Sequence, residues 1–342
     1  MTAVFCHNAA DRKAETWAKQ LEPLEHLEFA ISDAAKGIAA AVATVTKSCD
    51  NETSAPTLEH GLDVFHTTME AKRVLAGYWR RAEAAWEKAE AAELATAKSK
   101  RQGIDARGLA QAACAAWRQA VASLERVERL ELAWDRAHAA LDLFDAEGRL
   151  NERTRAHGEI SAALGDLTGP DWSKVRNALN DRRSLAFLDR MHRRLEQAEP
   201  RREWREAMAW RWRLRHRGVQ PAAPLTSLVQ AVAAGRQLDE AEHASYVRVA
   251  AVLQDTVRAS SAVECMNSVL RMQQSRHRRM TQPMLNLKRL YWNTRPFRSG
   301  PRKDVCPYQR LGLELPTYDF WGLLNADQAQ LTQQLSTQPN TE

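Results

Sequence analysis

The sequence has little cysteine and no long apolar run. Its five cysteines are Cys6, Cys49, Cys114, Cys265 and Cys306. None of them forms a C-x-x-C pair, so neither a disulfide framework nor a zinc ribbon is indicated. No apolar stretch approaches the length that spans a bilayer, and residues 1–20 lack the apolar segment of a signal peptide. These absences favour a cytoplasmic protein with no membrane partner.

Proline is absent between Pro56 and Pro170, a stretch that is rich in alanine, glutamate and arginine. Further helices are expected over 171–198 and 201–217, followed by a linker over 218–224. Within the proline-free stretch, apolar residues recur at three- and four-residue steps or their sums, which predicts one buried helix face. These residues are Trp117, Val121, Leu124, Val127, Trp134, Leu141 and Phe144.

Tryptophan is concentrated in the same part of the chain. Eight of the eleven tryptophans lie between residues 78 and 217. Large aromatic side chains bury more apolar surface than any other residue type, so we expect these to anchor a helical core. The alternative is that they are stacking platforms for nucleic-acid bases.

The sequence before the proline-free stretch has a different pattern. Residues 11–22 read as a helix, and residues 27–32 alternate apolar and polar, which predicts a short strand ending at Asp33. A helix is expected from about Ala34, and a second strand over 62–65. The expected order is strand, helix, strand and then a long helical stretch. This order indicates an α/β fold that the helical stretch interrupts.

The sequence after the helical stretch predicts one long helix over 238–275, which contains Glu264, and another over 281–294. Acidic residues are nearly missing here: between Arg258 and Lys303 there are eleven Lys and Arg residues, and the one acidic residue is Glu264. A basic segment of this kind favours contact with a phosphate backbone. The alternative is a solvated face, but the aromatic residues within the segment favour nucleic acid.

Two carboxylates have surroundings that suit a metal ion beside a phosphodiester. On a helix Glu264 shares one face with Asn267, Ser268 and Arg271, which places an amide, a hydroxyl and a guanidinium beside the carboxylate. Asp33 closes a strand, where α/β sheets present their ligands. The residue pattern alone leaves the ordinary alternatives open, an exposed glutamate and a helix N-cap.

Three segments resemble motifs of bacterial DDE-type transposases, the enzymes of insertion sequences. Residues 260–271 resemble the S-S-x-V-E-x-x-N-S-x-L-R signature around the last acidic residue. Residues 32–38, S-D-A-A-K-G-I, resemble the strand-end motif that holds the second Asp, and residues 60–66, H-G-L-D-V-F-H, the His-bearing strand that follows it. The continuation over 287–312, which includes Trp292-Asn293 and Cys306-Pro307-Tyr308, is similar to the family's tail.

The resemblance covers residues 11–75 and 240–324, and it implies metal-dependent phosphoryl transfer on DNA. In this family three carboxylates hold two Mg²⁺ (or Mn²⁺) ions that activate the attacking oxygen and stabilise the leaving one. Asp33 and Glu264 would be catalytic metal ligands, with His60 and His66 supporting the site. The expected DNA contacts are Asn267, Arg271, Arg276, Arg278, Arg279, Lys288, Arg289 and Arg295.

The implied fold is mainly α with a small α/β part: an incomplete RNase H-like core interrupted by a large all-α insertion domain. The expected division has five parts. These are a partial core over 1–75, a helical insertion over 76–220, a return to the core with the Glu-bearing helix over 221–275, a basic tail over 276–324 and a disordered end over 325–342.

The chain departs from the family pattern at its start, because Met1 lies only 32 residues before Asp33. We therefore expect the strand with the first Asp to lie upstream, and the chain as given to be unable to perform strand transfer. The favoured function is part of a transposase that acts on element ends and target DNA at the bacterial nucleoid. One alternative is a truncated, inactive DNA-binding or oligomerisation remnant that pairs with itself or with intact transposase. The other is a helical scaffold unrelated to DNA.

Overall fold

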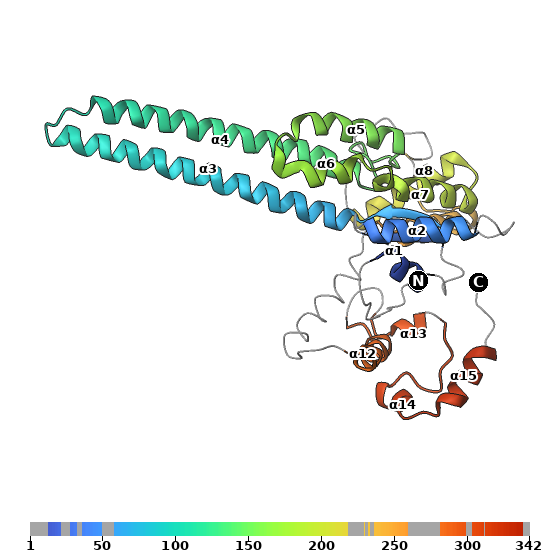
Figure 1. Ribbon diagram of the computed structural model, residues 1–342. Coiled ribbons are helices and arrows are strands. Elements are labelled where there is room, and N and C mark those ends of the chain that lie inside the picture. The colour runs from blue at the N-terminus through green and yellow to red at the C-terminus, as the bar shows by residue number, and fades with distance from the viewer. Residues whose placement is uncertain are drawn as a thin grey trace. The chain divides into compact units, whose positions relative to one another are not determined.

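The computed structural model shows a mainly helical protein with one small sheet, in line with the expected class (Figure 1). The chain divides into two compact units, residues 18–260 and residues 1–17 with 261–342. No helix in the described ranges is both long enough and apolar enough to cross a membrane. The structure describes residues 13–21, 28–32, 36–49, 58–217, 229, 232, 236–258, 281–298, 303–310 and 312–337.

The sheet consists of two parallel strands. Strand β1 (Phe29–Ser32) pairs with β2 (Glu59–Leu62), with Ser32 opposite Leu62 at the carboxyl end. Helix α2 (Lys36–Cys49) connects the strands, and α1 (Ala14–Leu21) precedes them. The structure thus confirms the expected first strand and the helices on either side of it.

The second strand was expected over 62–65, and these bounds are wrong. The strand ends at Leu62, and Val64 begins the long helix α3 (Val64–Arg101). The cause is Asp63, whose side chain accepts a hydrogen bond from the Phe65 N–H at 2.8 Å and caps the helix. Aspartate is among the residues that best satisfy the unpaired amides of a helix start.

Helices α3 and α4 (Arg107–Ala140) form a long hairpin that projects from the rest of its unit (Figure 1). The boundary expected between residues 75 and 76 falls inside α3. Helix α3 has 38 residues, which corresponds to about 57 Å. The absence of proline permits both helices to continue unbroken. Their distal halves meet through alanines, among them Ala89, Ala116 and Ala120, which allow close approach.

The apolar face expected along 117–144 is only partly buried. Val127 and Trp134 are buried, but Val121 is 44% exposed. The helix ends at Ala140, so Leu141 and Phe144 are buried in the turn that follows it. The difference arises because the distal half of α4 packs mainly against one partner helix, α3, and the rest of its surface faces solvent.

The helix expected over 171–198 is interrupted. The chain forms η1 (Pro170–Trp172), α6 (Ser173–Asn180), η2 (Arg182–Leu185) and α7 (Ala186–Ala198). The break lies at Asp181, whose carboxylate accepts from the Arg183 N–H at 2.9 Å and caps η2. Helix α5 (Arg153–Asp166) precedes this region, and α8 (Arg202–Arg217) confirms the helix expected over 201–217.

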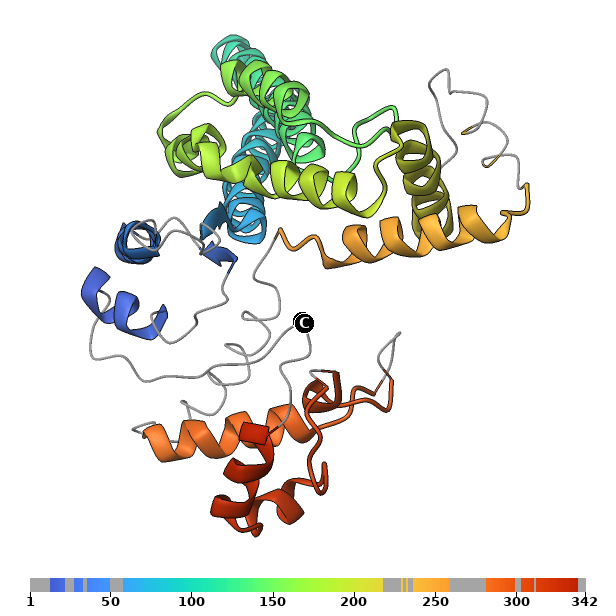
Figure 2. The ribbon, with the colours of Figure 1, turned by 90° about the vertical axis from the view of Figure 1, so that its right-hand side faces the viewer.

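A single large core joins these helices to α10 (Glu240–Asp255), which packs against α7 and α8 (Figure 2). Four tryptophans, Trp134, Trp172, Trp210 and Trp212, are buried in this core, as expected. The other four of the helical region are partly exposed and lie on the surface of the helices: Trp79, Trp86, Trp117 and Trp204.

The helix expected over 238–275 ends early. It begins with a capping box between Asp239 and Glu242 and stops at Asp255. Residues 256–258 are not helical, and Glu264 lies outside the described residues. The expectation of one continuous helix is therefore wrong.

The other unit contains α12 (Gln282–Thr294), which confirms the helix expected over 281–294. It is followed by α13 (Pro307–Arg310), α14 (Phe320–Leu324) and α15 (Gln328–Thr337). Residues 325–342, expected to be a disordered end, include α15. Tyr291 of α12 contacts Phe320 of α14 edge to face, with ring centroids 5.6 Å apart.

Candidate functional site

Five of the expected site residues are described: His60 and His66 near the sheet, and Lys288, Arg289 and Arg295 in or just after α12. The other expected residues lie outside the described part of the chain. They are Asp33, Glu264, Asn267, Arg271, Arg276, Arg278 and Arg279.

Ser32, His60, Asp181 and Arg183 form a polar group beside the sheet, which we name the strand-end cluster. His60 Nε2 lies 2.8 Å from Ser32 Oγ, and His60 Nδ1 lies 3.1 Å from Arg183 Nη1. A guanidinium can only donate, so His60 accepts at Nδ1 and carries its proton at Nε2. His60 therefore donates to Ser32, the last residue of β1.

The charges of the cluster favour a neutral His60. Burial is the main cause that lowers the pKa of His60 below its ordinary value; Arg183 lowers it further, and Asp181 acts in the opposite direction. Arg183 donates to Asp181 through Nε at 3.0 Å and Nη2 at 2.6 Å. These side-chain hydrogen bonds hold the pKa of Asp181 below its usual value. The neutral His60 imidazole lies between the Ser32 hydroxyl and the Arg183 guanidinium, and it thereby orients the end of β1.

Three chain segments meet at the start of α3, and we call this point the α3 junction. The Asp63 N–H donates to the Ser32 carbonyl at 2.9 Å, and the next amide, Val64 N–H, donates to the Arg258 carbonyl at 3.0 Å. The side chain of Arg258 donates to the Leu141 carbonyl at 2.9 Å. The junction thus joins the end of β1, the hairpin and the chain that returns after α10.

Asp63 and His66 have local roles at this junction. The Asp63 side chain is fully buried, and its carboxylate caps α3 through Phe65. His66 lies on the first turn of α3, with a side chain that is 42% exposed and Nε2 3.6 Å from Asp63 Oδ2. The structure therefore gives Asp63 the role of a helix cap, where the sequence had suggested a strand residue.

The described basic residues of the tail belong to the other unit. Lys288 and Arg289 are half-buried on α12. Arg295 forms the C-cap of α12, and its guanidinium lies 5.6 Å from the Trp292 ring and 6.0 Å from the Tyr291 ring. This arrangement places a cation beside two aromatic rings, which is a favourable electrostatic contact.

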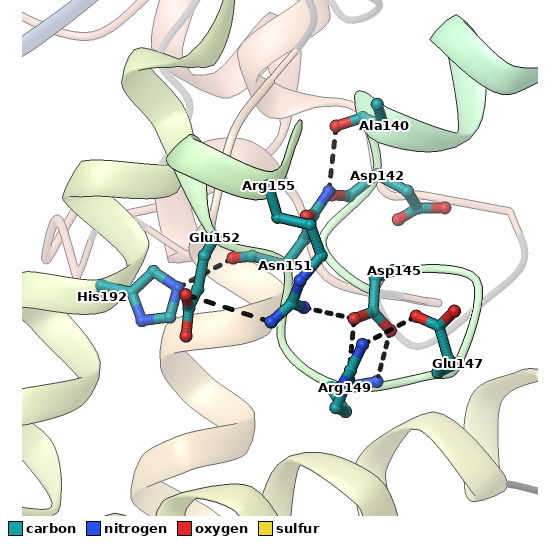
Figure 3. Close-up of polar contacts among 9 residues, drawn as sticks. All are labelled: Ala140, Asp142, Asp145, Glu147, Arg149, Asn151, Glu152, Arg155 and His192. Carbon is teal, nitrogen blue, oxygen red and sulfur yellow. Dashed lines mark hydrogen bonds and ion pairs between the residues drawn. The ribbon is translucent and has the colours of Figure 1, made fainter. Parts of the chain in front are cut away.

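A second polar group supports the turn between α4 and α5 (Figure 3). Asp145 accepts hydrogen bonds from the backbone and side chain of Arg149 at 2.8 and 2.9 Å, and it is also bonded to Arg155. Asn151 is buried, donates to the Ala140 carbonyl at 2.9 Å, and accepts at its own carbonyl from His192 Nε2 at 2.8 Å. These contacts fix the turn to α7.

Beside this turn lies a cavity of about 490 Å³. The four arginines of its lining are paired with carboxylates: Arg149 and Arg155 with Asp145, Arg155 also with Glu152, Arg202 with Glu206, and Arg205 with Glu196. Among the described residues, this lining therefore has no unpaired arginine. We assign these side chains to holding α5, α7 and α8 together.

Sequence reasoning missed Ser32, Asp181, Arg183 and Arg258. The available signal was the run Asn-Asp-Arg-Arg over 180–183, where an aspartate that can cap follows an asparagine inside a helical pattern. Among the described residues, no group of three His, Cys, Asp or Glu side chains could hold a metal ion. Searches among protein-family models, curated proteins and solved structures found no match to the chain.

Proposed function

We propose that the chain is part of a DDE-type transposase with an RNase H-like core, and that Asp33 and Glu264 hold divalent metal ions for the cleavage and joining of DNA. The motifs around these two residues suggest the reaction. The α3 junction is the structural observation that supports it.

The α3 junction brings together the segments that lead to the two carboxylates. Ser32 and Arg258 are bonded to the adjacent amides of Asp63 and Val64 at 2.9 and 3.0 Å. Asp33 directly follows Ser32 in the sequence, and Glu264 follows Arg258 by six residues. Six residues span about 20 Å at most. This limit is compatible with a shared metal site despite the long helical stretch between the two carboxylates.

The sheet is compatible with part of an RNase H-like core. Its two strands are parallel and connected by α2, and Asp33 follows the carboxyl end of β1. Ligands of open α/β sheets bind at the carboxyl ends of strands. The helical region from α3 to α10 leaves and returns at the α3 junction, as an insertion into such a core would.

The chain's own residues would position the site. Arg183 holds His60, and His60 holds Ser32, so the strand end before Asp33 is fixed by a residue of the helical region. Carboxylate oxygens are the ligands that Mg²⁺ and Mn²⁺ prefer, and the bound ions would supply Lewis-acid activation. The basic segment over 258–303 would bind the phosphates of element ends and target DNA.

Metal binding can be tested without relying on turnover. The full chain loaded with Fe²⁺ and treated with hydrogen peroxide and ascorbate should be cut near residues 33 and 264, because the bound Fe²⁺ reduces the peroxide to hydroxyl radicals at the site and ascorbate regenerates the Fe²⁺. Asp33→Asn and Glu264→Gln should each abolish both cuts, whereas the control Glu90→Gln, at an exposed position of α3, should not. Cutting at neither place, or cutting that persists in both variants, would refute the shared metal site.

Nicking distinguishes an enzyme from the alternative remnant. Supercoiled plasmid is incubated with Mg²⁺ or Mn²⁺ and either this chain or a chain extended upstream of Met1, and the same two variants are compared in both. Metal-dependent nicking by the extended chain that Asp33→Asn removes identifies a transposase. DNA binding that weakens with salt, without nicking by the extended chain, identifies a non-catalytic DNA-binding remnant.

A further inference from the structure

We propose that the hairpin tip, residues 98–107, is a second docking surface for the phosphate backbone of duplex DNA. The proposal rests on the proposed function only for the choice of DNA as the polyanion. Its evidence lies in a different part of the chain from Asp33, Glu264 and the basic segment over 258–303.

The tip has a surplus of positive charge. Lys98, Lys100, Arg101 and Arg107 are exposed, and the one acidic residue of the tip is Asp105. Within the described part of the chain, none of the four cations forms an ion pair. Two cations near the base of the hairpin are paired, Arg73 with Glu70 at 2.7 Å and Arg81 with Asp171 at 2.9 Å, whereas Arg80 resembles the tip cations in having no ion pair within the described residues.

Charge is separated along the hairpin. The shaft of the hairpin consists of residues 82–97 of α3 and the facing residues 108–124 of α4, and it has four glutamates, one lysine and one arginine. The tip between them has four cations and one acid. An acidic shaft with a basic end directs a polyanion to the end and away from the sides.

Helix stability explains only part of this arrangement. Lys98, Lys100 and Arg101 occupy the last turn of α3, where cations also stabilise the helix dipole. Arg107 is the first residue of α4, where a cation opposes the helix dipole. The Asp105 carboxylate accepts from the Arg107 N–H at 3.0 Å and offsets part of this effect. Arg107 is thus the tip cation that the stability of its own helix does not favour.

The hairpin places these cations far from the sheet. Lys98 lies 34 residues after Val64 in one continuous helix, which is a distance of about 50 Å. At 3.4 Å per base pair, this corresponds to about 15 base pairs of duplex. The tip would therefore contact DNA at a point that is about one and a half turns of the duplex away from the α3 junction.

An anionic membrane surface is the other polyanion to consider. Peripheral membrane contacts combine cations with a broad apolar face. At the tip and directly beside it, the exposed large apolar side chains are Leu94, Ile104 and Leu109, which are 70%, 59% and 41% exposed. Three aliphatic side chains without an aromatic residue do not make a broad apolar face beside four cations, so we take the phosphate backbone as the occupant.

The test compares two variants of the full chain with equal changes of net charge. The tip variant replaces Lys98, Lys100, Arg101 and Arg107 with Gln. The control variant replaces Arg80, Lys88, Arg118 and Arg129, exposed cations of the hairpin outside the tip, with Gln. Circular dichroism and Tm confirm that both variants are folded, and binding to a 40-base-pair duplex is measured by fluorescence anisotropy across a series of NaCl concentrations.

Each phosphate contact contributes about 0.9 to the slope of log Kd against log salt. The tip variant, which removes four contacts, should lower this slope by about 3.6, and the control variant by less than about 1. Equal slopes for the two variants would overturn the proposal. Binding to phosphatidylserine vesicles that only the tip variant loses, with an unchanged DNA slope, would overturn it in favour of a membrane surface.

The metal site and the docking surface at the hairpin tip can be refuted independently of each other. Loss of the tip effect leaves the Fe²⁺ cleavage near residues 33 and 264 unaffected. Absence of that cleavage, together with tip-dependent DNA binding, would retain the docking surface and remove the catalytic site.

Discussion

Glu199 connects three helices, and its charge should contribute measurably to stability. The residue is only 1% exposed and follows the end of α7. Its carboxylate accepts from Arg201 Nε at 2.7 Å and Nη2 at 3.0 Å, just before α8, and from Arg248 Nη2 of α10 at 3.0 Å. Replacing this carboxylate by an amide removes the charge and keeps the size.

The pKa of Glu199 indicates the size of the effect. Its hydrogen bonds to Arg201 are the main cause that lowers the pKa from 4.5 to about 2, and burial acts in the opposite direction. A shift of this size corresponds to about 3 kcal/mol at most. Arg201 and Arg248 have side chains that are 53% and 47% exposed, so solvent screens the pair. After this discount we expect about 1–2 kcal/mol.

The pH dependence has a definite sign. The folded carboxyl group has a lower pKa than the unfolded one, so its stabilisation is complete above about pH 4.5 and is lost as the pH falls toward 2. Urea unfolding of Glu199→Gln should therefore show a free energy of unfolding about 1–2 kcal/mol below the parent at pH 7, with a difference that shrinks below pH 4.5. The control Glu196→Gln, at a side chain that is 62% exposed, should change little. A difference that stays constant between pH 7 and pH 3 would refute the reasoning.

Three further predictions concern single residues. Gly148 has φ +87, and an added Cβ would lie 1.7 Å from Arg213 Nη1, so Gly148→Ala should lower the free energy of unfolding by about 1–3 kcal/mol. Gly158 has nothing within 4 Å of such a Cβ, and Gly158→Ala in helix α5 should stabilise by about 0.5–1 kcal/mol in the same urea titration. Arg183→Met should raise the pKa of His60, because Arg183 lowers it, while burial keeps it below its ordinary value. NMR titration of the imidazole would measure this, and an unchanged pKa would contradict the contact.

The sequence predicted elements well where the deciding interactions are local. The alternation over 27–32 and the helical pattern after Asp33 correspond to β1 and α2. The second strand was displaced because residues 62–65 have a strand-like pattern. Only the helix that follows makes Asp63 a cap. The break at Asp181 has the same origin, since its effect depends on one side-chain hydrogen bond to a backbone amide.

The candidate site was less accessible to sequence reasoning because its contacts are distant in the chain. Arg183 and His60 are 123 residues apart in sequence, and periodicity does not relate such positions. His60 could be chosen only through a family motif, and Arg183 belongs to no motif. Burial was misjudged for a similar reason. Val121 continues an apolar spacing but is 44% exposed, because the distal hairpin has no third helix against this face among the described residues.

The continuous course of α3 makes the outer half of the hairpin an arm that is anchored in the core. Six residues of α3, from Val64 to Ala82, are buried in the large core, and from Ala82 to the end of the helix at Arg101 the arm is about 28 Å long. A force applied at the hairpin tip would therefore act on the packing of α3 around Ala82 before it reached the backbone hydrogen bonds of the α3 junction, 18 residues earlier in the same helix.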